Sequence, residues 1–314
     1  MSDYTEYHNL WFAMGTEWQL QLFSSQPRTD LRAVAEAVVE EVERVEQQLS
    51  FYRPTSDLRS LNAGAAIRPT PVDPRLFRLL ETTKRISNAT EGAFDPTIGP
   101  LLRCWGFVGS SGAMPRTDEI ERCRSIAGLN HVTLDAQSFL VSFDCVGVEL
   151  EFGAIGKGYA IDRAVDILRD EQEISSALLH GGGSTFYGLG APPGANAWHI
   201  AIQRPNALHG ESAHAVSLRD RAVSVSAPHG KWFEHEGKRY GHVLDPRTGC
   251  PAAGSVLAAV ATSSATESDA LSTALLVLGE PGIDRIREYC PDAFLLLQTH
   301  ERADVIHTDQ DRLP

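Results

Sequence analysis

The chain has 314 residues, of which 42% are hydrophobic, so it is long and apolar enough for one large or two medium packed domains, which argues against disorder. Its 28 basic and 41 acidic residues give a formal charge of −13, which argues against a general nucleic-acid-binding surface. An anionic ligand would therefore need a local device such as a helix N-terminus, a lysine or a metal ion.

The first part of the chain predicts a strand, two helices and a long loop. Residues 17–23 alternate between polar and apolar side chains, which is typical of a strand with one buried face. Asp30 then precedes apolar residues at helical spacing up to Leu49, which predicts a helix with an N-cap. A second helix is expected at about 74–87, and the Gly- and Pro-rich segment 92–107 is expected to be a structured loop.

The middle of the chain places a glycine-rich loop between a strand and a helix. Residues 131–144 predict a β-hairpin, and residues 147–152 predict a further strand that runs directly into the sequence GAIGKG. A helix is expected from about 158 to 169, because its apolar residues fall on one face. Strand, glycine loop and helix therefore follow one another here.

Short strands and two further helices are expected in the rest of the chain. The strands are expected at residues 175–183, 197–203, 215–220, 222–227, 256–264, 292–299 and 303–308. The helices are expected at 266–279, where Gly279 ends the first of them, and at 281–290. The sequence has no repeats, low-complexity tracts or obvious linkers, so we predict an α+β fold in one domain that spans residues 1–314.

The five cysteines indicate buried thiols in a reducing compartment rather than disulfides or a zinc site. They are odd in number and form no CxxC pair. The N-terminus carries acidic residues where a secretory signal needs basic ones, and no stretch approaches the roughly 18 consecutive apolar residues of a membrane span. We therefore expect a cytoplasmic protein without a membrane span.

The segment EFGAIGKGY, residues 151–159, is the first candidate for a binding site. Its glycines let the backbone approach a ligand closely, N–H groups at a helix start attract phosphate, and Lys157 adds a positive charge. The segment is neither a Walker A loop nor GxGxxG, and glycine-rich turns before helices are often only tight connections. The residues alone therefore leave phosphate binding and a plain turn equally open.

Two further candidates lie in the last third of the chain. Asp269 and Thr273 are four residues apart and hence on one face of a predicted helix, where a carboxylate and a hydroxyl could hold Mg²⁺. A helix cap or a solvated polar face is the usual role of such a pair. In GHVLDPRTGCP, residues 241–251, His242 could act as a general base and Asp245 could orient the backbone or a metal. A turn is the common role of the DPRTG sequence.

Seven segments, taken in order, resemble the FAD:protein FMN transferase family, also called the ApbE family. The resemblance extends from Met14 to Gly279. The segments are AMGT at 13–16, LSFY at 49–52, SDLRSLN at 56–62, GAFDPTIGPLLRCWGF at 92–107, EFGAIGKGYAID at 151–162, GHVLDPRTGCP at 241–251 and SDALSTALLVLG at 268–279. One such motif would be a weak signal, but their number and order argue against coincidence.

The resemblance implies an α+β fold of mixed sheets packed with helices, with FAD in a cleft between two intimately packed halves and Mg²⁺ on its pyrophosphate. The residues that would line the FAD site are Met14, Tyr52, Ala93, Phe94, Asp95, Glu151, Lys157 and Val243. The main-chain oxygen of Ala154, together with Asp269 and Thr273, would hold the metal. His242 matches the family's proposed catalytic base, and Asp269 would serve catalysis through the metal.

The implied reaction cleaves the pyrophosphate of FAD and transfers FMN to a threonine hydroxyl of an acceptor protein, while AMP leaves. Mg²⁺ and Lys157 would neutralise the transferring phosphoryl group, and His242 would help to deprotonate the threonine. Two alternatives stay open. Water could replace the threonine, which would give an FAD pyrophosphatase, or the protein could bind flavin without catalysis.

The chain departs from the family pattern at four places. Glu151 stands where Asp is usual, and Gly156 stands where Ala usually precedes the lysine. Residues 224–233, SVSAPHGKWF, replace a common Ser-Thr-Ser-Gly run, and an acidic residue often follows the glycines of HGGGS at 180–184. Many relatives are exported lipoproteins, whereas this N-terminus shows no signal sequence, so the acceptor is expected to be cytoplasmic.

Overall fold

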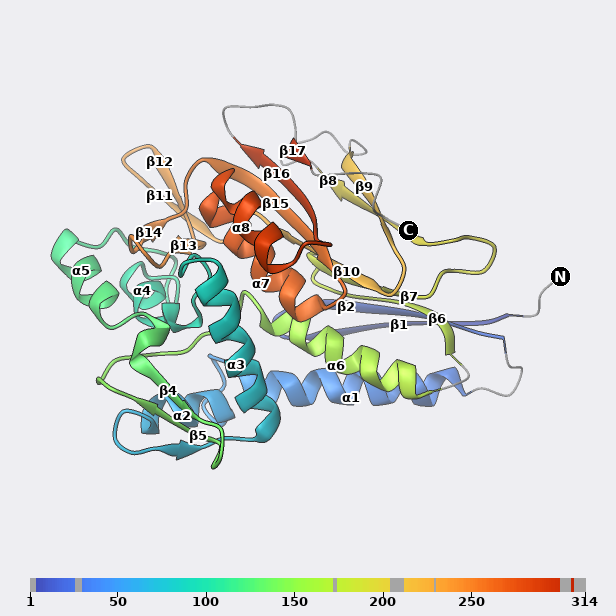
Figure 1. Ribbon diagram of the computed structural model, residues 1–314, viewed down its shortest axis with the longest axis horizontal. Helices are drawn as coiled ribbons and strands as arrows, with labels where there is room; N and C mark the ends of the chain where they lie inside the picture. The colour runs from blue at the N-terminus through green and yellow to red at the C-terminus, as the bar shows by residue number, and fades with distance from the viewer. Residues whose placement is uncertain are drawn as a thin grey trace.

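The computed structural model describes residues 4–25, 30–171, 174–203, 212–228, 230–299 and 306–307, and it shows an α+β fold built on one large sheet (Figure 1). The sheet order is β1-β2-β6-β7-β10-β15-β16-β17, and every neighbouring pair is antiparallel. Its strands are Thr5–Ala13, Thr16–Ser24, Ile174–Gly181, Thr185–Leu189, Arg221–Ser226, Ser255–Thr262, Phe294–Thr299 and Ile306–His307.

Three helices, α1, α6 and α7, cover one face of this sheet (Figure 1). They span Leu31–Leu49, Gly156–Asp170 and Ala265–Leu278. The apolar stripe of α1 is buried as its spacing predicts, and the Asp30 side chain accepts hydrogen bonds from the first turn of the helix. In contrast, α7 is buried on almost all sides, which is typical of a helix that lies inside the protein core.

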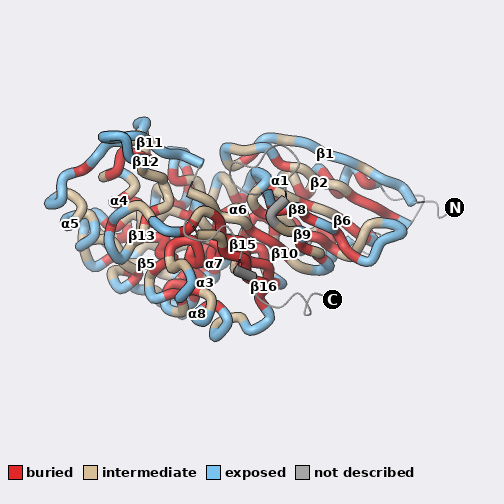
Figure 2. Tube along the Cα trace, turned by 90° about the horizontal axis from the view of Figure 1, so that it is seen from above, coloured by how far each residue is buried: buried red, intermediate tan, exposed pale blue. Residues whose placement is uncertain are grey.

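The opposite face of the large sheet is covered by the hairpin of β8 and β9, which span Trp198–Gln203 and Ser212–Leu218. Apolar side chains of this hairpin form a second core cluster with side chains of β10, β15 and β16. The sheet is therefore covered on both faces here, and Figure 2 shows buried residues in β15 and in β10, where they occupy the middle of the strand. None of the helices in the described part of the chain is long and apolar enough to cross a membrane.

A second group of elements packs against the end of the large sheet. Its helices are α2 at Asp57–Gly64, α3 at Pro74–Ala89, α4 at Gly99–Cys104 and α5 at Thr117–Ser125, and α8 at Pro281–Tyr289 packs on α7 and α3. Its short strands β3, β5 and β4 form one small sheet, and β11–β12 and β13–β14 form two hairpins. These strands are Thr70–Pro71, Leu140–Phe143, Val132–Asp135, Trp232–His235, Lys238–Gly241, Leu244–Asp245 and Cys250–Pro251. One core cluster runs through both groups of elements.

The strand predicted at 147–152 is wrong. The segment is extended, and its backbone is held by a side chain and a loop instead of a neighbouring strand. Asn62 exchanges two hydrogen bonds of 2.9 Å with the backbone of Leu150, and Glu151 N–H donates to the Pro96 carbonyl oxygen at 2.6 Å. Buried Leu150 and Phe152 produce the alternation that predicted a strand.

The segment predicted as a loop at 92–107 contains a 3₁₀ turn, Pro96–Ile98, followed by α4. Pro100 lies in the first turn of α4, where a missing N–H group costs nothing. The sequence analysis also missed β1, β3, β7, α2, α5 and the β11–β12 hairpin, whereas the turn expected at DPRTG is present and joins β13 to β14. The other predicted helices and strands are confirmed to within a few residues, although α6 begins at Gly156 rather than 158, and only 306–307 of the strand predicted at 303–308 is described.

The closest approach between α6 and α7 occurs at Gly158. A Cβ atom at this position would lie 2.0 Å from the Ala265 carbonyl oxygen and 2.8 Å from the Asp269 Cβ. Gly158 N–H donates to Asp269 Oδ2 at 3.0 Å. One turn further along α6, Asp162 accepts hydrogen bonds from the first N–H groups of α7, those of Ala265 and Thr266, at 2.7 and 2.9 Å. Each helix therefore provides a carboxylate for the start of the other.

We predict that Gly158→Ala lowers the Tm of the protein by roughly 2–10 °C, because the added methyl group would force α6 and α7 apart. Gly156→Ala is the matched control. Its Cβ would lie 3.4 Å from the flexible end of the Met14 side chain, so the Tm should stay within about 2 °C of that of the wild type. Thermal unfolding followed by circular dichroism measures both variants. Equal Tm values for the two would contradict a helix contact that requires glycine at 158.

Candidate functional site

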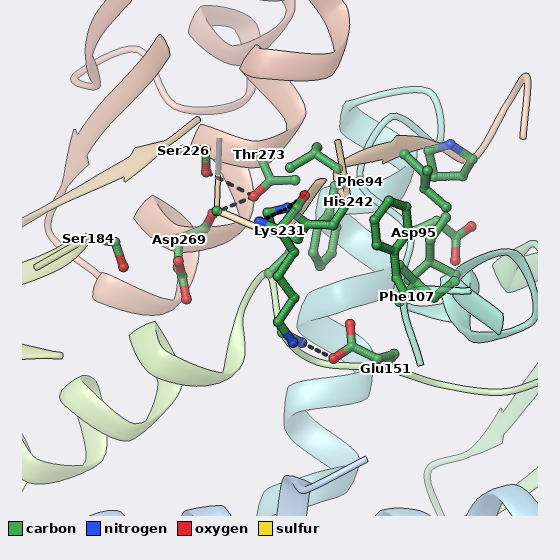
Figure 3. Close-up of a pocket in the computed structure, with 18 of the residues that line it drawn as sticks. Phe94, Asp95, Phe107, Glu151, Ser184, Ser226, Lys231, His242, Asp269 and Thr273 are labelled. Carbon is green, nitrogen blue, oxygen red and sulfur yellow. Dashed lines mark hydrogen bonds between the residues drawn. The ribbon is translucent and has the colours of Figure 1, made fainter. Parts of the chain in front are cut away.

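A cavity of about 560 Å³ lies between α6 and α7 on one side and the segment 93–107 with β13 on the other. All of the predicted site residues line it except Met14. They are Tyr52, Ala93, Phe94, Asp95, Glu151, Ala154, Lys157, His242, Val243, Asp269 and Thr273. Figure 3 shows Asp269, Thr273 and Ser226 at one end of the cavity and Phe94, Asp95 and Phe107 at the other. The cavity thus has a polar end and an apolar end.

Oxygen atoms gather at the polar end. Asp269 is 5% exposed, and its Oδ1 accepts a hydrogen bond from the Thr185 hydroxyl at 3.3 Å. One turn along α7, the Thr273 hydroxyl lies 3.1 Å from the Ser226 hydroxyl at the end of β10. Lys157 Nζ lies 3.8 Å from Asp269 Oδ2, so a positive charge adjoins the carboxylate. A carboxylate can accept about four hydrogen bonds or ligand contacts, and Asp269 therefore has capacity left.

The oxygen atoms at this end fit a hard divalent cation. Within the described ranges, the Ala154 carbonyl oxygen accepts no hydrogen bond, because Gly158 N–H, which follows it by four residues, donates to Asp269 instead. A free carbonyl, a buried carboxylate and a hydroxyl are the ligand types that Mg²⁺ prefers. The residues present are therefore suited to hold such an ion beside the start of α6.

The predicted free N–H groups at the start of α6 are only partly available. Gly156 N–H donates to the Phe152 carbonyl oxygen at 2.7 Å, and Gly158 N–H donates to Asp269. The sequence analysis expected N–H groups at this helix start to bind phosphate. This expectation is wrong for Gly156 and Gly158, because their N–H groups already donate to protein acceptors. At this end of the cavity, Lys157 and the dipole of α6 are the remaining sources of positive charge for an anionic ligand among the described residues.

His242 is held by the backbone of Lys231. Its Nδ1 lies 3.1 Å from the Lys231 carbonyl oxygen and 3.2 Å from the Lys231 N–H group. When Nδ1 carries the proton and donates to the carbonyl oxygen, Nε2 keeps its lone pair and can accept a proton. Burial lowers the pKa of His242 below its ordinary value, and the nearby charges of Lys231 and Lys157 lower it further. The imidazole is therefore neutral at neutral pH, as a general base must be.

The opposite end of the cavity is apolar and suits an aromatic ring system. Phe94 and Phe107 are both buried, and Ile98, Leu102 and Leu244 complete the lining. Asp95 is an acidic residue at this otherwise apolar end, but its carboxylate already accepts hydrogen bonds from the protein. It accepts hydrogen bonds from the Thr97 hydroxyl at 2.6 Å and from Leu129 N–H at 3.1 Å, and burial raises the pKa of its carboxyl group. Asp95 thus fixes the shape of this end.

Comparison with known proteins identifies the family. The ApbE family model matches residues 14–294. The chain is 31% identical over 298 residues to the FAD:protein FMN transferase of Treponema pallidum (strain Nichols), a match that covers 90% of this chain and 82% of that protein. It is 30% identical over 278 residues to the FAD:protein FMN transferase of Escherichia coli (strain K12), with 85% and 76% covered.

The chain belongs to the ApbE family. The family resemblance found in the sequence is confirmed, and so is the α+β fold. The crystal structure of the ApbE protein of Thermotoga maritima superposes with a TM-score of 0.87 at 29% identity, with 97% of each chain covered. The flavin transferase ApbE from Vibrio cholerae superposes with a TM-score of 0.82 at 26% identity, with 98% of each chain covered.

Met14 is the one predicted site residue of this ApbE-family chain that does not line the cavity. It lies in the turn between β1 and β2, with a φ of 51°, and its side chain packs toward Gly156 at the start of α6. Met14 therefore supports the glycine loop from behind. Gly156 stands where Ala is usual in the family, and a Cβ atom here would lie 3.4 Å from the end of the Met14 side chain, so either residue fits at this position.

The sequence analysis missed several residues that line the cavity. Lys231 and Ser226 belong to the segment 224–233, and Ser184 belongs to 180–184, the two segments that depart from the family pattern. Phe107 also lines the cavity. It lies in the segment 92–107, which the family resemblance covers, but the resemblance assigned no role to its side chain. The departures from the family pattern could therefore have indicated these residues, because both departing segments line the cavity.

Glu151 is the half-buried acid between the two ends of the cavity. Its Oε1 accepts a hydrogen bond from Gly153 N–H at 2.9 Å. Burial raises the pKa of its carboxyl group, although this hydrogen bond and the charges of Lys157 and Lys231 oppose the rise. A raised pKa means that the folded state favours the protonated form. The stabilising contribution of Glu151 is therefore present below its ordinary pKa and is lost as the pH rises through the raised value.

We predict that Glu151→Gln raises the Tm at pH 7–8 by about 1–3 °C in the absence of flavin and leaves it almost unchanged below pH 4. Glutamine keeps the acceptor for Gly153 N–H but carries no charge, so the difference should grow as the pH rises. The exposed Glu121 of α5 provides the control Glu121→Gln, for which no such growth is expected. A Glu151→Gln difference that is independent of pH would contradict a cost of ionising this side chain.

Proposed function

We propose that this protein is a Mg²⁺-dependent enzyme that transfers FMN from FAD to a threonine hydroxyl of an acceptor protein and releases AMP. One observation carries the proposal: Asp269, Thr273 and the free Ala154 carbonyl oxygen line the same cavity as His242. One cavity thereby combines oxygen atoms that would hold a metal, a neutral base, and an apolar end for a flavin or an adenine. The names of the relatives and of the superposed structures point to the same activity.

Asp269, Thr273 and the Ala154 carbonyl oxygen would hold Mg²⁺. When bound, Mg²⁺ supplies positive charge that stabilises the phosphoryl oxygens in the transition state. Lys157 contributes a second positive charge beside Asp269. The 3.0 Å hydrogen bond from Gly158 keeps the carboxylate of Asp269 in place before substrate arrives.

His242 would accept the proton of the threonine hydroxyl at Nε2 while its Nδ1 donates to the Lys231 carbonyl oxygen. The threonine oxygen then forms a bond to the phosphorus of the FMN half. The bond between that phosphorus and the bridging oxygen breaks, and AMP leaves with the bridging oxygen. No covalent enzyme intermediate is needed, since the threonine attacks directly. The acceptor threonine must reach the cavity from solvent, and we propose a cytoplasmic acceptor.

We predict that incubation with FAD, Mg²⁺ and an extract of the source cell attaches fluorescent flavin to a protein that is visible on a denaturing gel. Asp269→Asn should reduce this labelling by about a hundredfold or more, because the variant loses the charge that holds the cation. Asparagine keeps an acceptor for Gly158 N–H, so the fold is retained. The control is Asp284→Asn on the exposed face of α8, which should label normally.

The same reactions are analysed for AMP by chromatography. AMP production without labelled protein would contradict the transferase and favour hydrolysis of FAD. Tight FAD binding without any AMP at any Mg²⁺ concentration would instead indicate a flavin-binding protein. Full labelling by the Asp269→Asn variant would show that the charge of Asp269 is not needed to hold the metal.

The lowered pKa of His242 predicts the pH dependence of kcat/KM for FAD. A lowered pKa means that the imidazole stays neutral to lower pH than usual, so the acidic limb should lie below pH 6.5, about the ordinary value for histidine. His242→Asn should reduce kcat by about 10²–10⁴ and should remove this limb. Initial rates between pH 5 and 9 test both points. An acidic limb at or above pH 6.5, or one that persists in the variant, would contradict the assignment of His242 as the base.

A further inference from the structure

Lys231 is a cation at the cavity that forms no close ion pair within the described residues. It lines the cavity, and its Nζ lies 5.8 Å from the centre of the Tyr52 ring. In the part of the chain that the structure describes, this ammonium group forms no ion pair or hydrogen bond. Lys157, the other lysine of the cavity, has Asp269 as its partner. The charge of Lys231 is therefore not neutralised by a close carboxylate, and its nearest printed side-chain contact is the ring of Tyr52.

The hairpin that follows Lys231 is fixed to the protein by aromatic packing. Phe233 of β11 and Tyr240 of β12 stack on each other with ring centres 5.4 Å apart. Tyr240 stacks on Trp105 at 5.7 Å, and Phe233 packs on Phe107 at 5.8 Å. Trp105 and Phe107 belong to the segment that lines the apolar end of the cavity. The packing of the hairpin and the contacts with His242 therefore hold the backbone of Lys231, while the residue itself is exposed.

The two parts of Lys231 face different groups. Its backbone N–H and C=O groups hold the ring of His242, whereas its side chain extends toward Tyr52. Tyr52 is 61% exposed and lines the cavity together with Lys231, so a ligand in the cavity would adjoin both side chains. The charge of Lys231 also acts on Glu151, which places this charge within electrostatic range of the middle of the cavity.

We propose that the ammonium group of Lys231 binds a phosphate oxygen of the dinucleotide substrate, as a second cationic contact in addition to Lys157. This inference rests on the proposed function. The pyrophosphate carries two negative charges, and the leaving AMP phosphate gains a further one, so an exposed cation on a well-held backbone suits both substrate and product. Lys231 lies in the segment 224–233 that departs from the family pattern, and its ammonium group provides a charge there.

Binding of FAD and of riboflavin, measured by quenching of flavin fluorescence, tests the proposal because riboflavin contains the same ring system without phosphate. Lys231→Met should raise the Kd for FAD about tenfold and should leave the Kd for riboflavin unchanged. Lys231→Arg should restore FAD binding, since it restores the charge. Lys238→Met is the matched control. Lys238 lies on the β11–β12 hairpin that follows Lys231. Its Nζ lies 5.3 Å from the centre of the Tyr240 ring, but Lys238 does not line the cavity.

Three outcomes would overturn the proposal. Unchanged FAD binding by Lys231→Met would show that the ammonium group does not contact the substrate. An equal loss for FAD and riboflavin would show that Lys231 acts through the ring system, by way of Tyr52, and not through phosphate. A loss of FAD binding that arginine fails to restore would show that charge is not the cause. Failure of the wild-type protein to bind FAD would be a separate result, because it would refute the proposed function itself.

Discussion

The contact between the N-terminal turns of α6 and α7 is the constraint on which the site depends. Asp269 of α7 accepts the N–H group of Gly158, and Asp162 of α6 accepts the first N–H groups of α7. Each helix thereby satisfies backbone groups that the other leaves unpaired at its start. The exchange requires glycine at 158, because a Cβ atom at this position would collide with the Ala265 carbonyl oxygen. It also frees the carbonyl oxygen of Ala154, which becomes available as a ligand.

The same burial acts in opposite directions on the two titratable groups nearest the middle of the cavity. Removal from water disfavours the charged form of any group, so it raises the pKa of the Glu151 carboxyl group and lowers that of the His242 imidazole. Both groups are consequently shifted toward neutrality. Glu151 and His242 therefore add little charge of their own to the cavity, where Lys157 adjoins Asp269 and Lys231 forms no close ion pair within the described residues. A chain with a net charge of −13 can thus present a local positive field.

The two ends of the cavity are built by different kinds of structure. The polar end consists of side chains on α7 and at the ends of β10 and of the glycine loop, all held by the large sheet and its core. The apolar end is formed by the segment 93–107 and by Leu244 of β13, and a separate hydrophobic cluster packs the β11–β12 hairpin against these elements. Rigid elements therefore position the proposed phosphoryl chemistry, while a smaller aromatic unit shapes the space for a ring system and carries Lys231.

The sequence by itself determined the family, most of the regular elements and 11 of the 23 residues that line the cavity. The reason is that helix caps, alternating strands and glycine loops are local, and the ordered motifs extend over most of the chain. It could not show that 147–152 is held by Asn62 instead of a strand, because that partner is 88 residues away. Nor could it show that Gly158 donates to Asp269, that Met14 lies behind the loop, or that Lys231 faces Tyr52. Contacts between distant segments decide these features, and only the packing of the helices, the sheet and the hairpins brings those segments together.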